Sequence, residues 1–268
     1  MQHAGSFARR SEKKRRGEIM KVAFQTDIGK IRPHNEDCGG IFVNKDGDYL
    51  AVVADGMGGH RAGDVASEMT ITYLKKMWEE TTNISSPQIA EQWLKEHVAK
   101  INETLFQHAL HHDECQGMGT TIVSAICTKQ FVTVGHIGDS RCYVLNAHGF
   151  QQVTEDHSLV NELVKNGQIS KEDAEYHPRK NVLLRALGTE RQVKMDIKSL
   201  VLEENDILLL CSDGLSNKVS EQTMIDILTS EQSIENKAQA LIDLANEHGG
   251  EDNITLAIIE FSSERESG

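Results

Sequence analysis

Apolar runs alternate with amphipathic stretches along the chain from Met20 onward. Short runs rich in β-branched and aliphatic residues predict strands, and longer stretches with apolar residues three or four positions apart predict helices. The expected strands are residues 22–25, 49–54, 119–127, 131–137, 141–145, 151–153, 197–202, 207–211 and 254–261. Strands at both ends of the chain, with helices in blocks between them, favour packed sheets covered by helices over alternating βαβ units.

Two long helices are expected between the second and third strands. Asp64 can cap the first of them, and Pro87 suits the first turn of the second. The apolar positions of the two faces are Val65, Met69, Tyr73 and Met77 in the first helix, and Ile89, Trp93, Ile101, Leu105 and Ala109 in the second. Two further helices are expected at 221–229 and 234–245, whereas 29–40 is expected to be a loop.

Residues 157–185 interrupt this pattern. The segment is polar, contains Gly167 and Pro178, and has two short helical stretches at 159–165 and 171–175. Its polar composition and short helices are typical of a segment with low local stability.

Composition indicates a globular protein. The 268 residues are 38% hydrophobic and 26% charged, which allows one large domain or two small ones. No run of about 18 apolar residues predicts a membrane span, and no apolar signal segment opens the chain. Five cysteines without a C-x-x-C spacing favour a reducing compartment, so we expect a cytoplasmic location.

The net charge of −13 is distributed unevenly. Residues 1–19 hold six basic and two acidic residues, while the remainder holds 22 basic and 39 acidic residues, a net charge of −17. We expect 1–19 to be a disordered basic extension, a vector-derived sequence or an artefact of the assigned start, and 262–268 to be a tail. The acidic body argues against a nucleic-acid substrate, because phosphate backbones bind basic surfaces. It is compatible with bound cations.

Aspartates follow or precede apolar strands next to glycine or asparagine at four places. They are Asp55, Asp139, Asp213 and Asp252. A single such site is ordinary turn chemistry, but aspartate is depleted in strands and costly to bury without a partner. Four of them on strands that could converge predict a cage of hard oxygen ligands for divalent cations.

Six motifs that contain these aspartates occur in a fixed order. They are Arg32-Pro33-His34-Asn35-Glu36-Asp37, Asp55-Gly56-Met57-Gly58-Gly59-His60, Gly117-Met118-Gly119-Thr120-Thr121, Gly138-Asp139-Ser140-Arg141, Ser212-Asp213-Gly214-Leu215 and Asp252-Asn253. Together they resemble the bacterial metal-dependent protein phosphatases (PPM, or type 2C), over roughly residues 20–261. Each motif alone is weak, and the specificity comes from their order and spacing.

The resemblance implies an α+β fold, a four-layer α-β-β-α sandwich with two central antiparallel sheets and a small flap subdomain at about 157–185. It also implies hydrolysis of phosphoserine and phosphothreonine in proteins, by attack of a hydroxide that bridges two Mn²⁺ or Mg²⁺ ions. A weaker third ion is expected. The implied partners are phosphorylated proteins, namely a Ser/Thr kinase and its substrates, with neither nucleic acid nor membrane insertion, and the implied state is a monomer.

The resemblance also assigns roles to individual residues. Asp55 would bridge both ions and the Gly56 carbonyl would help to hold one of them, while Asp213 and Asp252 would bind the other. Asp139 would share the third ion with Asp213. Arg32 would clamp the substrate phosphate with its bidentate fork, and Glu36 and Asp37 would order metal-bound waters. These residues are Arg32, Glu36, Asp37, Asp55, Gly56, Asp139, Asp213 and Asp252.

One position departs from the pattern of some eukaryotic members. Where those carry a histidine two residues after the bridging aspartate, proposed as a general acid, this chain has Met57. His60 is close in sequence but out of register, so the proton donor to the leaving group stays open.

Other interpretations also remain. Asp139 could hold Arg141 or cap a turn, and Arg32 could be a surface residue. The chain could be a catalytically silent binding module, although the metal aspartates are all present. It could be a two-metal hydrolase of another fold, although no H-x-H-x-D cluster occurs.

Overall fold

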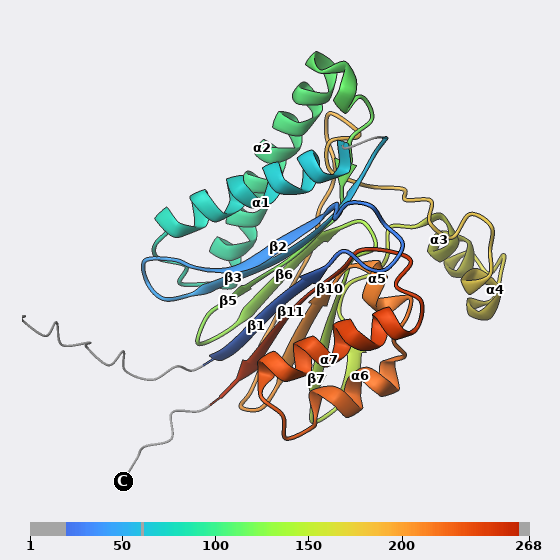
Figure 1. The fold of residues 1–268 in the computed structure, drawn as a ribbon. Coiled ribbons are helices and arrows are strands. Elements are labelled where there is room, and N and C mark those ends of the chain that lie inside the picture. Colours follow the sequence, from blue (N-terminus) through green and yellow to red (C-terminus); the bar gives the residue numbers. More distant parts are fainter. Residues whose placement is uncertain (1–19, 60–61, 263–268) are drawn as a thin grey trace, which may run out of the picture.

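The computed structural model describes residues 20–59 and 62–262, which form two packed antiparallel sheets with helices on both outer faces (Figure 1). This arrangement confirms the expected α+β sandwich. The predicted basic extension 1–19, His60 and residues 263–268 of the predicted tail lie outside the described residues. Within the described ranges, no helix is long and apolar enough to cross a membrane.

Each sheet is a path of antiparallel neighbours. The first has the order β1 (Met20–Asp27), β11 (Ile254–Phe261), β10 (Ile207–Cys211), β7 (Arg141–Asn146) and β8 (Gly149–Gln152). The second has the order β2 (Asp37–Val43), β3 (Tyr49–Met57), β5 (Ile122–Cys127), β6 (Val132–Ile137) and β9 (Asp196–Leu200), and β4 (Gly119–Thr120) pairs with β3. The first and last described strands pair with each other, Met20 opposite Phe261.

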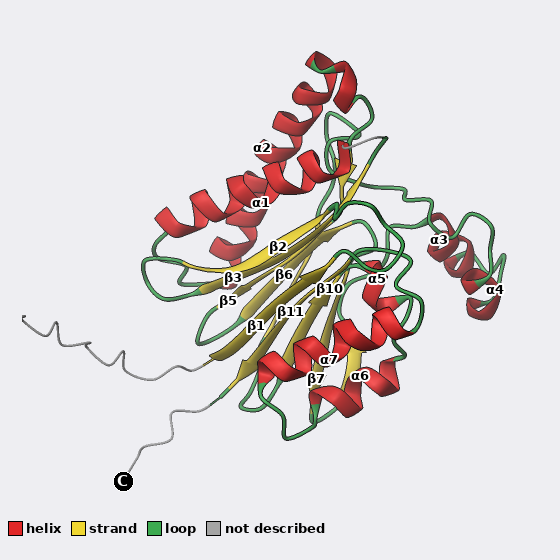
Figure 2. Ribbon diagram, viewed as in Figure 1, coloured by secondary structure: helices red, strands yellow, loops and turns green. Residues whose placement is uncertain are grey.

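Helices complete the layers and add a protruding segment (Figure 2). On the outer face of the second sheet lie α1 (Ala62–Glu80) and α2 (Pro87–His111), followed by a short 3-10 turn at Asp113–Cys115. On the outer face of the first sheet lie α5 (Asp213–Ser216), α6 (Glu221–Leu228) and α7 (Ile234–Glu247). The two remaining helices, α3 (Leu159–Lys165) and α4 (Lys171–Glu175), stand apart from the layers.

The sheets are apolar on both faces because each lies between another sheet and a helix layer. In β3, Ala51 and Val53 join the core between the sheets, whereas Leu50 and Val52 join the core under α1 and α2. Successive side chains in a strand point to opposite faces, so a continuous apolar run serves both cores. This explains why the sequence of β3 shows no polar alternation.

Two predictions about local structure were wrong. Strand β2 begins at Asp37, inside the expected loop 29–40. The prediction missed this strand because its two glycines hide the strand pattern. In α1 the predicted Met69 and Met77 are half-buried and pack against the core, and Leu74 and Trp78, which the prediction did not name, are fully buried. In α2 the prediction was wrong for Ile89, which is exposed.

Residues 158–183, which we call the flap segment, contain α3 and α4. Neither helix has a buried residue. Both begin with a serine cap: Ser158 accepts from the Asn161 amide and Ser170 from the Asp173 amide. Local capping rather than core packing therefore holds these helices, as expected for an element of low local stability.

The α1–α2 contact generates a stability prediction. Trp78 is fully buried, donates from Nε1 to the Phe42 carbonyl oxygen at 3.1 Å and packs edge-on against Trp93 at 5.0 Å between ring centroids. Trp78→Ala should lower the free energy of unfolding by about 3–5 kcal/mol, because it leaves a cavity and an orphaned carbonyl. The exposed aromatic Tyr176 offers a control whose Ala variant should stay within about 0.5 kcal/mol of the parent. Urea unfolding measures both, and equal effects would contradict the packing argument.

Candidate metal centre

Five aspartates come together at one edge of the sandwich. Strands β3 and β10 run toward this edge and β2 and β11 run away from it, so the end of one strand lies beside the start of its neighbour. Asp37 is directly opposite Asp55 in the β2–β3 ladder. The turn between β6 and β7 carries the third aspartate, and the segments after β10 and before β11 carry the others; the five are Asp37, Asp55, Asp139, Asp213 and Asp252.

Backbone contacts hold Asp55 rigidly. Its N–H donates to Thr121 Oγ1 at 3.0 Å, and its carbonyl oxygen accepts from the Thr121 N–H at 2.8 Å and from Thr120 Oγ1 at 2.9 Å. The next residue, Gly56, lies so close to Gly63 of α1 that a Cβ would overlap the Gly63 carbonyl oxygen. Glycine is therefore required at position 56 by close packing.

Asp37 is a buried carboxyl with one unpartnered oxygen. Its Oδ2 accepts from Ser212 Oγ at 2.7 Å, and Ser212 Oγ in turn accepts from the Thr255 N–H at 3.0 Å. Its Oδ1 has no hydrogen-bond partner. Buried polar atoms are nearly always paired, so this oxygen fits a cation or a cation-ordered water. Ser212 was quoted in the sequence motif without a role, because nothing in the sequence pairs it with a residue 175 positions away.

The electrostatics of the cluster point the same way. Burial, together with repulsion from neighbouring aspartates, raises the pKa of Asp37 to about 7 and that of Asp139 to about 7. The same causes raise the pKa of Asp55 well above its usual value and also raise the pKa of Asp213. Protein side chains supply too little positive charge here, and a divalent cation would reverse the sign of each of these effects.

Asp213 and Asp252 reach the cluster from the first sheet. Asp213 begins α5 and accepts from Asn217 Nδ2 at 3.0 Å. Asp252 precedes β11, and its neighbour Asn253 is buried. The Asn253 side chain accepts from the Glu36 N–H at 2.8 Å and donates to the carbonyl oxygens of Ile28 and His34 at 2.8 and 3.0 Å. Asn253 thus fixes the loop that carries Arg32 and Glu36, a role that the motif alone did not reveal.

Arg32 lies at the exposed mouth of the cluster. Its Nη2 is 2.8 Å from Asp252 Oδ2 and its Nη1 is 4.0 Å from Glu36 Oε2. The Arg32 side chain is 44% exposed, so it remains available to an anion arriving from solvent. Burial raises the pKa of Glu36, which belongs to the same loop as Arg32.

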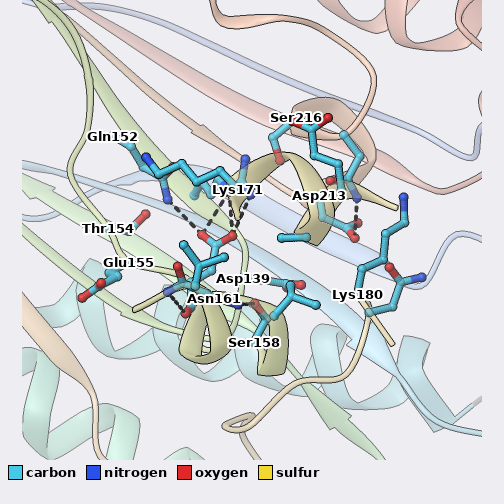
Figure 3. A pocket seen from close by; sticks show the side chains of 18 of the residues that line it. Asp139, Gln152, Thr154, Glu155, Ser158, Asn161, Lys171, Lys180, Asp213 and Ser216 are labelled. Atoms are coloured by element: carbon cyan, nitrogen blue, oxygen red, sulfur yellow. Dashed lines mark hydrogen bonds and ion pairs between the residues drawn. The ribbon is translucent and has the colours of Figure 1, made fainter. Parts of the chain in front are cut away.

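Asp139 does not hold Arg141, which was the alternative open from sequence. The Arg141 guanidinium binds the Asp156 carboxylate instead, with Nη2 2.7 Å and Nε 3.0 Å from its oxygens. Asp139 and Asp213 line one cavity of about 810 Å³, which Lys171 and Lys180 of the flap segment border (Figure 3). Asp139 is therefore free to face this cavity.

A second group of potential ligands lies beside the flap segment. In the described ranges, one group of three such side chains has all its ligand atoms within 4.8 Å of one another, namely His136, His157 and Asp196. The predicted aspartates are spread more widely. Wider spacing suits two ions roughly 3.5–4 Å apart, which share their ligands.

The raised pKa values generate a pH prediction for the metal-free protein. Because the folded-state pKa of Asp37 exceeds the unfolded value of about 3.9, its contribution is favourable below about pH 4 and is lost as the pH rises through about 7. In EDTA, Asp37→Asn should therefore gain at least about 1 kcal/mol of unfolding free energy relative to the parent between pH 4 and pH 7.5. Urea unfolding across that range measures the difference.

Excess Mn²⁺ should reverse the pH effect by stabilising the parent most at the high-pH end, where the carboxylates are ionised. A parent-to-variant difference that is independent of pH would contradict the assigned electrostatics.

Comparisons with known proteins identify the family of this chain. The protein phosphatase 2C family model matches residues 32–247. The chain is 51% identical over 241 residues to the serine/threonine phosphatase stp of Listeria welshimeri, across 90% of this chain and 96% of that relative. The crystal structure of serine/threonine phosphatase Stp1 from Staphylococcus aureus has a TM-score of 0.88 and 39% identity, across 92% of this chain and 97% of that one.

A further solved structure is described with its metal. The catalytic domain of the serine/threonine protein phosphatase PstP, in complex with two manganese ions, has a TM-score of 0.79 and 31% identity, across 91% of this chain and 99% of that one. The family expected from the sequence motifs is thereby confirmed: this chain belongs to the protein phosphatase 2C family.

Proposed function

We propose that this phosphatase hydrolyses phosphoserine and phosphothreonine in proteins at a centre of two Mn²⁺ or Mg²⁺ ions. The observation that carries the proposal is the set of buried aspartates at one sheet edge whose pKa values are raised by burial and mutual repulsion. Such a cluster needs positive charge that the chain does not provide. Relatives named serine/threonine phosphatases and a relative with two manganese ions support the same proposal.

The donor set fits hard divalent cations. We assign Asp55 and the Gly56 carbonyl oxygen to one ion, with Asp55 shared, and Asp213 and Asp252 to the other; Asp139 would share a weaker third ion with Asp213. Carboxylate and carbonyl oxygens are the ligands that such ions prefer. When bound, the ions supply an activated water as nucleophile and neutralise the charge that develops on the phosphoryl oxygens.

The remaining residues orient the reactants. Arg32 would release Asp252 in part and hold the substrate phosphate, for which its planar fork is well suited. Asp37, with its free Oδ1, and Glu36 would accept hydrogen bonds from ordered water and fix its orientation. Met57 has no proton to give to the leaving alkoxide, so that proton comes from water or from another side chain.

Two alternative functions can be compared with the fold and with the metal ligands that the chain retains. A two-metal hydrolase of another fold is incompatible with a TM-score of 0.88 to a phosphatase structure. A silent binding module would have lost one of its metal ligands, whereas Asp55, Asp213 and Asp252 are all retained.

We further propose that the protein acts as a monomer in the cytoplasm and opposes a Ser/Thr protein kinase by dephosphorylating the kinase and its substrates. All five cysteines are free, which suits a reducing compartment. The acidic body disfavours nucleic acid as a partner.

Asp213→Ala tests the metal centre. It should lower turnover of a phosphothreonine peptide at saturating Mn²⁺ by at least about 10³-fold, because metal ions contribute several kcal/mol to transition-state stabilisation. The variant should be at least as stable as the parent in EDTA, because one repelling carboxylate is gone. Phosphate release and urea unfolding measure the two effects.

Asp243 provides the matched control, since it is an exposed helical aspartate that accepts from Gln239 Nε2 at 2.8 Å. Asp243→Ala should keep parental turnover. Full turnover in Asp213→Ala would refute the metal assignment, and a folded parent inactive in both Mn²⁺ and Mg²⁺ would favour the silent module.

Arg32→Ala tests the phosphate clamp. Loss of a charge-assisted bidentate contact should reduce kcat/KM on the phosphopeptide by about 10- to 100-fold, mainly through KM. Arg32→Lys keeps the charge without the planar fork, so its kcat/KM should lie between those of the parent and Arg32→Ala. Arg191, whose side chain is 77% exposed, is the control for loss of a positive charge. Kinetics of Arg32→Ala that match those of Arg191→Ala would exclude the clamp.

A further inference from the structure

The flap segment joins the body of the protein through His157. This residue lies just before α3. Its carbonyl oxygen accepts from the N–H of Leu184, which follows the flap segment, at 2.8 Å. A short bridge pairs Ser158 with Leu183, and the Leu159 N–H donates to the Val182 carbonyl oxygen at 2.8 Å. The two ends of the flap segment are thus tied to each other at the point where they leave the sandwich.

His157 is also bound to the turn that precedes Asp139. Its N–H donates to the Gly138 carbonyl oxygen at 2.9 Å, and the Gly138 N–H donates to His157 Nδ1 at 3.1 Å. We call this reciprocal pair the clasp. Gly138 has φ +106°, a conformation that favours glycine, and a Cβ there would come within 2.6 Å of Thr121 Cγ2. The same Thr121 binds the backbone of Asp55.

The clasp fixes where the proton of His157 must be. Since Nδ1 accepts from a backbone N–H, the neutral ring carries its proton on Nε2, which lies 3.1 Å from Asp196 Oδ2. The other oxygen of Asp196 is 3.3 Å from Arg185 Nη1. The ring is stacked on His136 at 4.6 Å between centroids. Burial lowers the pKa of His157, which favours this neutral form.

These contacts argue against a cation at His136, His157 and Asp196. Nδ1 of His157 is already occupied by the Gly138 N–H, and Nε2 carries the proton. With the proton on Nε2, the nearby Arg185 Nη1 donates to Asp196 Oδ1 at 3.3 Å and supplies the positive charge beside Asp196 that a metal would otherwise supply. The cluster is therefore built as a hydrogen-bond network.

We propose that His157 is a positioning residue whose clasp with Gly138 sets both the base of the flap segment and the place of the Asp139 carboxylate. The inference rests on the proposed role of Asp139 as a metal ligand. A contiguous path runs from the flap segment through His157 and Gly138 to Asp139 on one side and through Thr121 to Asp55 on the other. Residues that orient ligands in this way tune metal affinity without touching the metal.

Two substitutions of His157 separate the clasp from the rest of the network. The amide oxygen of His157→Asn can take the place of Nδ1 and accept from Gly138, but its side chain is too short for Asp196. His157→Gln can reach Asp196 but leaves the Gly138 N–H without an acceptor. We expect His157→Asn to preserve the clasp and His157→Gln to break it.

The first readout is amide hydrogen exchange in EDTA, which does not depend on activity. Gly138 and Leu184 should exchange about 10-fold faster in His157→Gln than in the parent, and at nearly the parental rate in His157→Asn. Amides of β11 report whether each variant is folded. The second readout is the Mn²⁺ concentration for half-maximal hydrolysis of p-nitrophenyl phosphate. This concentration should rise about 10-fold in His157→Gln and far less in His157→Asn.

Equal exchange rates and equal Mn²⁺ requirements in the two variants would overturn the proposal. Should either variant unfold, ¹⁵N shifts of the His157 ring in the parent decide, and a protonated Nδ1 at pH 7.5 would overturn it as well. A parent that hydrolyses no phosphoester would refute the proposed function, while the exchange comparison would still test the clasp.

Discussion

Repulsion among buried carboxylates is the main electrostatic constraint on this fold. Burial and mutual repulsion raise the pKa values of four carboxyl groups, those of Asp37, Asp55, Asp139 and Asp213. Without metal, ionisation of these groups therefore destabilises the folded state. Such a cluster persists because the surrounding backbone is fixed independently of it. The two sheets supply that rigidity, and the unpartnered oxygen of Asp37 marks where external positive charge is needed.

The antiparallel sandwich meets this requirement with its topology. Strands with apolar side chains on both faces bury three cores, two under helices and one between the sheets. Consecutive antiparallel strands place their ends and beginnings at one edge, so residues far apart in sequence become neighbours there. Side-chain links such as Ser212 to Asp37 and Asn253 to the Glu36 amide then join the two sheets at the site.

The periphery follows different rules from the core. The helices of the flap segment bury no side chain and depend on serine caps, yet both ends of the segment are tied down by His157 and by the Arg141–Asp156 ion pair. On the proposed function, a firm base with a weakly packed tip would allow the tip to adapt to protein substrates while the turn at Asp139 stays in place. The two hydrogen bonds between Gly138 and His157 would then connect the proposed substrate recognition with the proposed metal site.

The sequence by itself determined the order of most strands and helices, the last strand at Ile254–Phe261, and the four aspartates at strand ends that the structure brings to one edge, because apolar periodicity and Asp-Gly turns are local signals. It missed β2, where Gly39 and Gly40 hide the pattern, and it did not name Leu74 and Trp78 as buried residues of α1, because the sheet below decides which side of the helix is buried most deeply. Only the tertiary structure decided that Arg141 binds Asp156 rather than Asp139, that Ser212 binds Asp37, and that His157 holds Gly138. Those pairs form between segments distant in the chain, and no local pattern encodes which partner a polar side chain meets.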